Sequence, residues 1–152
     1  MTEGKIVGIY LRKETGEPVL AAEEARAIAG RGIEGDHGFA AEGHTIDPSR
    51  EATLIESEAI EALEREYKVA LGPGAARRNI VTRGVALNHL VGREFKVGEA
   101  KMRGMRLCEP CDHLAKLTQP KTLDGLVHRG GLRAQILEGG TIRVGDSVGE
   151  VS

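Results

Sequence analysis

The residues best suited to chemistry in this sequence are the two cysteines of the motif Cys108-Glu109-Pro110-Cys111. The motif follows a predicted strand and precedes a predicted short helix over 112–117. A thiolate is the reactive form of cysteine, and the N-terminus of a helix stabilises it by favouring negative charge. Cys111 stands at that N-terminus, with arginine and histidine residues close by in the sequence. The sequence therefore predicts Cys111 as the reactive thiol, with Cys108 as a second catalytic candidate.

This motif is compatible with four kinds of site. Zinc would need further ligands such as His113 or His128, but no second Cys-x-x-Cys pair occurs in the chain. Thioredoxin-type disulfide exchange would need a helix and further strands after the motif, and only about forty residues remain. The third alternative is a soft-metal ligand or a sulfur-carrying nucleophile. The fourth is a pair of structural thiols in a turn.

A second set of candidates consists of arginines in glycine-rich turns. Guanidinium groups bind phosphate or carboxylate through two parallel hydrogen bonds, and glycine lets backbone N–H groups approach an anion. Because the net charge of the chain is −2, a small anionic molecule fits better than a polyanion. The predicted anion-binding residues are Arg50, Arg77, Arg78, Arg129 and Arg133.

A third candidate is the glycine-rich loop from Gly32 to Gly38, which carries Asp36 and His37. These two side chains could bind a metal, cap a turn or orient an arginine. The default interpretation is a tight turn that the Asp36 side chain closes on its own backbone.

Composition limits the classes of function. The chain has 152 residues and a mass of 16.2 kDa, so we expect residues 1–152 to form a single domain. Lysine and arginine number 21 against 23 aspartate and glutamate, and aromatic residues make up only 3%. Nucleic-acid binding usually needs a basic surface or stacking rings, and this composition provides neither.

Targeting signals are not expected. No apolar run approaches the roughly 20 residues of a membrane-spanning helix, and the N-terminal segment carries acidic residues, unlike a signal peptide. Two cysteines are too few for a disulfide framework. We therefore expect a cytoplasmic protein.

The hydrophobic pattern predicts a mainly β protein with one good helix. The helix follows Ser57, which can cap its free N–H groups, and Ile60, Leu63 and Tyr67 give it one apolar stripe. The segment 21–29 is compatible with a short helix or an extended run. Strands are predicted over 6–11, 52–55, 79–82, 94–97, 100–107, 134–138, 141–144 and 147–151.

Glycines mark two special positions in these strands. Gly104 stands where the alternation of the 100–107 strand changes phase, which predicts a β-bulge. Gly139 and Gly140 separate the last long strands, and their type predicts a type I′ hairpin turn that pairs the two. Many short strands with one or two helices indicate an α+β protein built on a small, partly closed β-barrel.

Several short motifs occur in the order seen in MOSC domains, and the chain resembles that family from Ile6 to Val148. The MOSC domain is the module found at the C-terminus of molybdenum-cofactor sulfurases. The matching motifs are Gly32–His37, Arg50–Ile55, Arg77–Thr82, Gly92-Arg93, Cys108–Cys111 and Gly140–Asp146.

This resemblance implies a fold like the small β-barrel domain of pyruvate kinase and a molybdenum–molybdopterin cofactor. Cys111 corresponds to the cysteine that ligates molybdenum in the mitochondrial amidoxime-reducing component and in bacterial hydroxylaminopurine reductases. The stretch from Arg77 to Asn79 resembles one that faces the pterin in such proteins. Asp36, His37 and Arg50 fall in two further motifs and are also expected to bind the cofactor. A soft thiolate suits molybdenum, and arginine suits the pterin phosphate.

The resemblance implies either reduction of N-hydroxylated compounds or transfer of sulfur to the molybdenum cofactor, and a non-catalytic carrier of cofactor or sulfur is the alternative. We expect no N-terminal substrate domain and no pyridoxal-phosphate desulfurase. A reductase would then need an electron donor or a dimer mate, and a sulfur carrier would need a separate cysteine desulfurase. Pyridoxal phosphate is not expected here, because none of Lys5, Lys101 and Lys116 stands in a recognisable Schiff-base setting.

Overall fold

The computed structural model describes residues 3–14, 18–70, 72–108, 125–126 and 128–151. Cys111 and the predicted helix over 112–117 lie outside these residues. The α-helix of the described part is α1 (Ser57–Tyr67), and its short 3-10 helices are η1 (Pro48–Arg50), η2 (Pro73–Ala76) and η3 (Leu87–Leu90). The strands are β1 (Gly4–Leu11), β2 (Leu20–Ala22), β3 (Glu24–Ile28), β4 (Gly32–Ile33), β5 (Ala52–Glu56), β6 (Ile80–Arg83), β7 (Glu94–Val97), β8 (Ala100–Leu107), β9 (Leu132–Glu138), β10 (Gly140–Arg143) and β11 (Ser147–Glu150).

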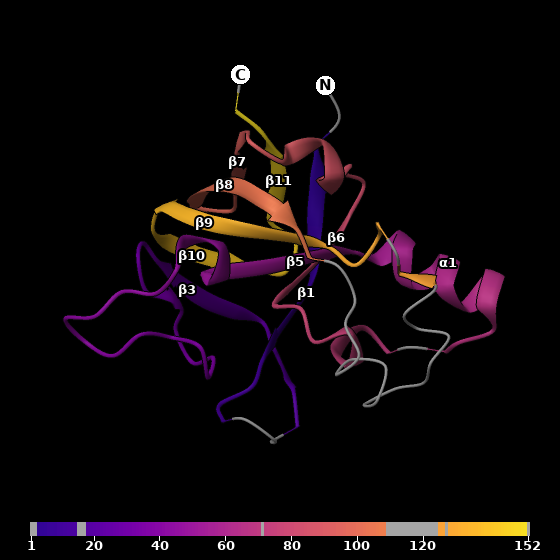
Figure 1. The fold of residues 1–152 in the computed structure, drawn as a ribbon, viewed down its shortest axis with the longest axis horizontal. Coiled ribbons are helices and arrows are strands. Elements are labelled where there is room, and N and C mark those ends of the chain that lie inside the picture. Colours follow the sequence, from indigo (N-terminus) through magenta and orange to yellow (C-terminus); the bar gives the residue numbers. More distant parts are fainter. Residues whose placement is uncertain (1–2, 15–17, 71, 109–124, 127, 152) are drawn as a thin grey trace.

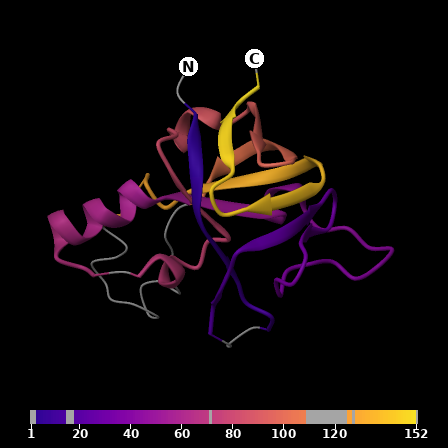
Figure 2. The ribbon, with the colours of Figure 1, turned by 180° about the vertical axis from the view of Figure 1, so that it is seen from behind.

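Seven of these strands form a closed barrel in the order β11-β7-β8-β9-β5-β6-β1, and β2 extends it beyond β1. The barrel closes because Gly4 in β1 pairs with Val148 in β11. Neighbouring strands are antiparallel except for β5 and β6, which run parallel with α1 as the connection between them. Figure 2 shows β1 and β11 side by side, with both termini at the same end of the barrel. The predicted mainly β, barrel-type fold is confirmed.

A second sheet of β10, β3 and β4 packs on the barrel. This sheet contributes Ala25, Ala27, Ile33 and Ile142 to the same hydrophobic core as the barrel residues, among which Phe95 and Met102 are fully buried. Figures 1 and 2 show that the loop after β4 and the helix α1 lie on opposite sides of the barrel. The core therefore extends from the barrel interior under the second sheet.

Helix α1 covers part of the outer wall of the barrel. Ile60 and Leu63 on its apolar stripe pack with Ile55 of β5 and Val81 of β6, which point away from the barrel interior. Ser57 does not cap the helix as predicted, because it is already the first helical residue and its hydroxyl bonds to the carboxylate of Glu58. The capping position falls to Glu56, whose side chain makes no capping hydrogen bond.

Glu56 is instead used to hold η3. One of its carboxylate oxygens accepts a hydrogen bond from the backbone N–H of Leu87 at 3.1 Å. Burial raises the pKa of Glu56, and the Leu87 bond partly offsets this effect. The Glu56 side chain thus binds the backbone of Leu87 in η3 and does not cap the start of α1.

The predicted hairpin at Gly139-Gly140 is wrong. β10 pairs with β3 in the second sheet, whereas β9 stays in the barrel, so the two glycines mark the point where the chain changes sheets. A Cβ atom on Gly139 would lie 2.6 Å from the Ala27 carbonyl oxygen, and one on Gly140 would lie 2.8 Å from the backbone of Glu99. Close approach of other backbone segments explains these glycines.

Two other expectations had mixed outcomes. The bulge in β8 is confirmed, because the pairing with β9 shifts register between Gly104 and Arg106. A Cβ on Gly104 would lie 2.1 Å from the Leu90 carbonyl oxygen, so η3 packs directly on the bulge. The segment 21–29 takes the extended alternative, as β2 and β3. Among the described residues, no helix combines the length and apolar character needed to cross a membrane.

Candidate functional site

The register of the barrel brings the ends of several strands into one row. Leu107 at the end of β8 pairs with Leu132 at the start of β9, and the next β9 residue, Arg133, pairs with Thr53 at the start of β5. The start of β6 pairs with β5 on one side and with the end of β1 on the other. Residues just before and just after these strands therefore meet at one place on the barrel wall.

A pocket of about 540 Å³ lies at this place. Leu54 and Leu132 point into the barrel core, so the alternation of a strand turns their neighbours Thr53 and Arg133 outward toward the pocket. The volume is in the range of sites that hold small molecules. The lining residues are Tyr10, Arg12, Val19, Asp36, His37, Gly38, Ile46, Asp47, Arg50, Thr53, Arg77, Arg78, Asn79, Cys108 and Arg133.

Most of the site candidates predicted from sequence meet in this pocket, although they come from separate segments of the chain. The β4–η1 loop and η1 supply some of these residues, and the segment between η2 and β6 supplies others. The predicted residues in the lining are Asp36, His37, Arg50, Arg77, Arg78, Asn79, Cys108 and Arg133.

Arg78 has its guanidinium bound to backbone carbonyl groups. Its Nε donates to Gly130 O at 2.8 Å, and its two terminal nitrogens donate to Ala76 O and Cys108 O at 3.3 Å each. These bonds join η2, the end of β8 and the segment before β9. Arg78 therefore holds the pocket wall together and contributes positive charge.

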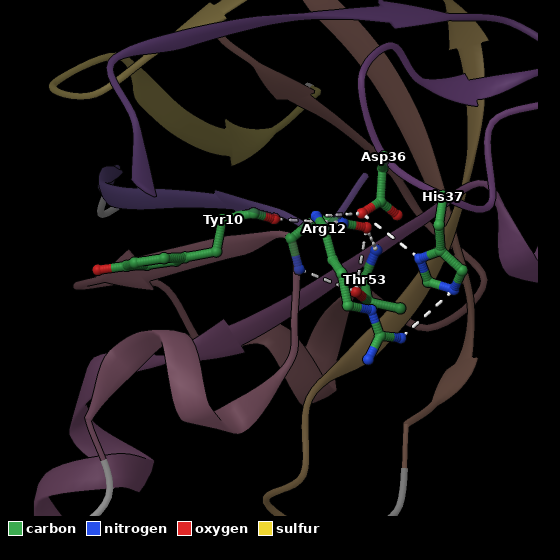
Figure 3. Close-up of polar contacts among 6 residues, drawn as sticks. Tyr10, Arg12, Asp36, His37 and Thr53 are labelled. Carbon is green, nitrogen blue, oxygen red and sulfur yellow. Dashed lines mark hydrogen bonds and ion pairs between the residues drawn. The ribbon is translucent and has the colours of Figure 1, made fainter. Parts of the chain in front are cut away.

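Asn79 has a similar structural use. Its side-chain oxygen accepts hydrogen bonds from the backbone N–H and the hydroxyl of Thr53, both at 3.2 Å, and its amide nitrogen donates to Tyr10 O at 3.5 Å. Its own N–H donates to the Thr53 hydroxyl at 3.0 Å. Figure 3 shows that Tyr10 joins this network through its main chain, while its ring points away from Thr53. This network fixes the chain that carries Arg77.

The remaining arginines of the lining are differently placed. Within the described part of the chain, no group accepts a hydrogen bond from the guanidinium of Arg50, Arg77 or Arg133. Arg77 also holds a left-handed backbone with φ of 60°, which is unfavourable for a residue with a Cβ atom. Strained backbone of this kind is often found at binding sites. Among the described residues, these three guanidinium groups therefore keep their hydrogen-bond donors unused.

The Asp36–His37 pair contacts an arginine, Arg12, which is compatible with one of the three roles open from sequence, the orientation of an arginine. The Arg12 N–H donates to Asp36 Oδ1 at 3.0 Å, and the His37 N–H donates to Arg12 O at 2.6 Å. The turn itself closes through main-chain bonds from Asp36 to Ile33 and from Phe39 to Asp36. The expected closure by the Asp36 side chain is therefore replaced by a bond across to Arg12.

The pocket has an excess of positive charge although the whole chain is slightly negative. Among the described residues, five arginines and two aspartates are in the lining, so with His37 neutral their positive charges exceed the negative ones by three. The Ser49 hydroxyl and backbone N–H, followed by the charges of Arg50 and Arg106, hold the pKa of Asp47 below its ordinary value. Asp47 is thus ionised at neutral pH and offsets only part of the arginine charge.

Cys108 lies at the end of β8, where only 3% of its surface is exposed, and it contributes to the pocket lining. Its backbone N–H donates to Gly131 O at 2.7 Å. Cys111 and His113, two of the residues considered for a metal, lie outside the described residues. In the ranges that the structure describes, no three His, Cys, Asp or Glu side chains gather around a common point as a metal site.

Among the predicted residues that the structure describes, Arg129 is the one that does not line the pocket. Its guanidinium faces Glu66 at the end of α1, with contacts of 3.4 and 3.5 Å, and donates to Gly125 O at 3.0 Å. The Arg129 bond and charge lower the pKa of Glu66. Arg129 thus ties the segment before β9 to α1.

Sequence reasoning missed Arg12, which completes the pocket from the end of β1. Arg12 stands in a polar run after a strand, and such residues are usually solvated surface charges. Its role depends on a contact with the 36–37 turn, which is 24 residues away in sequence. Its neighbours in sequence, Lys13 and Glu14, give no signal that would distinguish Arg12 from an ordinary surface arginine.

The fold has clear relatives among solved structures. The YuaD protein from Bacillus subtilis superposes with a TM-score of 0.82 at 18% identity, over 97% of this chain and 94% of that chain. YiiM from Geobacillus stearothermophilus gives 0.75 at 17% identity, over 98% and 75% of the two chains. YiiM from Escherichia coli gives 0.70 at 18% identity, over 97% and 70%. These similarities concern the fold.

Comparison with curated proteins found no match. The model of the MOSC domain family matches residues 41–149, a range that contains η1, α1, most of the barrel and the Cys108 motif. The predicted resemblance is confirmed by this match. The chain belongs to the MOSC domain family.

Proposed function

We propose that the pocket binds the molybdenum–molybdopterin cofactor and that the protein reduces N-hydroxylated compounds. The MOSC domain family is associated with the molybdenum cofactor. The observation that carries the proposal is a set of three guanidinium groups, those of Arg50, Arg77 and Arg133, for which the described residues provide no acceptor. They surround one pocket that Cys108 also lines.

The donors of the pocket fit the chemistry of this cofactor. Molybdopterin carries a phosphate group, and arginine is the side chain best suited to bind phosphate through parallel hydrogen bonds. The excess of three positive charges balances such a dianion with one charge to spare. A volume of about 540 Å³ matches a ligand of this class.

Each part of the pocket has a role under this proposal. Arg50, Arg77 and Arg133 would hold the anionic part of the cofactor, while Arg78 and Asn79 keep the wall that carries them in place. Cys111 would supply the thiolate ligand of molybdenum, as in related MOSC proteins. When bound, the metal supplies two-electron redox chemistry, which an N-hydroxyl group needs to leave as water with uptake of two protons. Electrons would come from a reductase partner or another chain.

Metal analysis tests the binding step without any assay of turnover. Protein produced in a host that makes the cofactor should contain molybdenum and pterin in near-stoichiometric amounts. Cys111→Ser should lose the metal, and Cys108→Ser should lose less, because Cys108 is buried at a strand end. Stoichiometric zinc in place of molybdenum, or full molybdenum content in Cys111→Ser, would contradict the proposal.

Turnover separates the enzyme from a carrier. With an artificial reductant, the molybdenum-loaded protein should convert N-hydroxylated bases or amidoximes to the amines. A loaded protein that accepts sulfur from a cysteine desulfurase as a persulfide, and that reduces none of these compounds, would favour sulfur transfer. A loaded protein that does neither would favour a cofactor carrier.

A further inference from the structure

Arg12 carries a buried donor for which the described residues provide no acceptor. The atom is Nε of the guanidinium. Among the residues that the structure describes, it is the one buried side-chain nitrogen or oxygen that makes no hydrogen bond. An unpaired buried donor is destabilising, and more so when it belongs to a charged group. Nε itself is covered, so a ligand in the pocket that Arg12 lines would contact the guanidinium through its terminal nitrogens.

The other end of the Arg12 guanidinium is held by His37. An Nη2 nitrogen of Arg12 lies 3.4 Å from His37 Nε2. Arginine has only donors, so Nε2 must be the acceptor and the ring proton must sit on Nδ1. Asp36 Oδ1 lies 3.8 Å from Nδ1, on the side where a carboxylate favours that proton. Figure 3 shows the imidazole between the Asp36 carboxylate and the Arg12 guanidinium.

The three residues also hold one another through the main chain. The Arg12 N–H donates to Asp36 Oδ1, and the His37 N–H donates to Arg12 O. The end of β1 and the turn after β4 are therefore fixed relative to each other at two points. His37 is placed against Arg12 by the fold, before any ligand arrives.

The partner of Arg12 differs from the partners of other arginines, because the imidazole of His37 in this tautomer carries no charge. Arg83 and Arg129, which lie beside α1, face the carboxylates of Glu61 and Glu66, and those charges cancel. A neutral imidazole instead orients Arg12 without cancelling its charge, and it takes one of five N–H donors. An oriented, uncompensated guanidinium is a strong site for an oxyanion.

We propose that Arg12 is an oxyanion-binding residue of the pocket and that His37, set by Asp36, is the positioning residue that holds it as an uncompensated cation. The ligand group is a tetrahedral oxyanion, either a phosphate monoester or a metal oxyanion such as molybdate. This inference rests on the proposed function only for the identity of the natural ligand.

Anion titration of the full-length, metal-free protein tests the role of Arg12. Inorganic phosphate and molybdate are titrated separately by calorimetry at constant ionic strength and neutral pH. Arg12→Gln should weaken binding of the preferred anion by about ten-fold or more, since a charge-assisted bond is lost. Arg26→Gln on β3 removes an exposed arginine outside the pocket lining and should change nothing. Equal affinities in wild type, Arg12→Gln and Arg26→Gln would overturn the proposal.

Two substitutions of His37 test the positioning role. In His37→Gln the amide oxygen can still accept from Arg12, so anion affinity should stay within about three-fold of wild type. In His37→Glu a carboxylate would neutralise Arg12, so affinity should fall as far as in Arg12→Gln. Thermal unfolding of each variant reports whether the fold is intact. Equal anion affinity in the glutamine and glutamate variants would overturn the positioning role.

The arms of this experiment separate the two ligand sources and the two proposals. Preference for phosphate assigns the site to a phosphate monoester, and preference for molybdate assigns it to a metal oxyanion. If Arg77→Gly abolishes anion binding while Arg12→Gln has no effect, the role of Arg12 is overturned and the proposed function stands. If the wild type binds neither anion, the oxyanion site is overturned, and the molybdenum content of purified protein decides the proposed function independently.

Discussion

The outer wall of the barrel has two neighbouring regions with opposite chemistry. On β5, Thr53 and Ile55 are two residues apart and share a face, as do Asn79 and Val81 around the start of β6. Helix α1 covers Ile55 and Val81 with apolar side chains, whereas Thr53 and Asn79 are polar and line the pocket. Two residues along each strand therefore separate the apolar surface that α1 covers from the polar surface that lines the pocket.

The two regions also treat charge differently. Beside α1, Arg83 pairs with Glu61 at 2.9 Å and Arg129 faces Glu66. In the pocket, Arg50, Arg77 and Arg133 have no hydrogen-bond acceptor among the described residues. Among the described residues, the arginines beside the helix are thus paired with carboxylates, whereas three of the pocket arginines have no hydrogen-bond acceptor.

The largest expected effect comes from breaking the pocket wall at Arg78. Arg78→Ala removes three hydrogen bonds to backbone carbonyls and leaves those oxygens unsatisfied. We expect the free energy of unfolding to fall by about 3 kcal/mol or more, measured by urea denaturation. A loss below about 1 kcal/mol would place Arg78 with the free arginines of the pocket.

Its neighbour Arg77 should behave in the opposite way. Arg77→Gly relieves the left-handed backbone, so stability should stay equal or rise by up to about 1 kcal/mol. The same substitution should weaken phosphate or molybdate binding by about ten-fold. Arg77→Lys, which keeps the charge, serves as the matched control and should retain most of the affinity. Destabilisation by Arg77→Gly would show that its side chain has a structural role.

Glu51 is a buried carboxyl group that is bound by backbone N–H groups and not by an arginine. Its Oε1 accepts hydrogen bonds from the backbone N–H groups of Gly30 at 2.8 Å and Ile136 at 3.3 Å, and only 3% of the residue is exposed. Burial raises the pKa of Glu51 above its ordinary value of 4.5, and the two N–H bonds partly offset this.

The sign of the resulting pH dependence is set by which state binds the proton. Between 4.5 and the raised pKa, the folded protein holds a proton on Glu51 that the unfolded chain has released. Stability therefore falls as pH rises through this window, by about 1.4 kcal/mol per pH unit at most. Glu51→Gln should lack this fall in urea denaturation across the window. Parallel pH profiles for the two proteins would contradict the assignment.

The smallest effect is expected at Arg129. Because its pair with Glu66 is partly exposed, Arg129→Gln should change stability by less than about 1 kcal/mol and leave anion affinity unchanged. Glu66→Gln, which removes the other partner, is the control. A ten-fold loss of anion binding in Arg129→Gln would return Arg129 to the binding residues predicted from sequence.

Elements with strong local signals were predictable from the sequence. The alternating runs gave β1, β5, β7 and β8, and the phase change at Gly104 gave the bulge, because side-chain burial in a strand follows a period of two. The apolar stripe of α1 was equally clear. Ser57 failed as a cap because the local preference of serine lost to tertiary contacts at Glu56 and Glu58.

The pairing of strands into sheets was harder to predict from the sequence. Gly139-Gly140 looks like a hairpin turn in sequence, yet the glycines are required by the Ala27 and Glu99 backbones, which lie far away in the chain. A glycine that provides a positive φ and a glycine that provides space are identical in sequence. Only the packed structure distinguishes them.

The sequence by itself determined the seven strands of the barrel, the helix α1, the family motifs and the residue types available for an anion site, but not the strands β2 to β4. The tertiary structure decided which arginines form hydrogen bonds within the protein and which have donors without an acceptor among the described residues. Arg77 and Arg78 are adjacent and chemically identical, but one points its donors at three carbonyls and the other finds none among the described residues. Hydrogen-bond partners come from segments distant in sequence, so the role of each guanidinium follows from the fold.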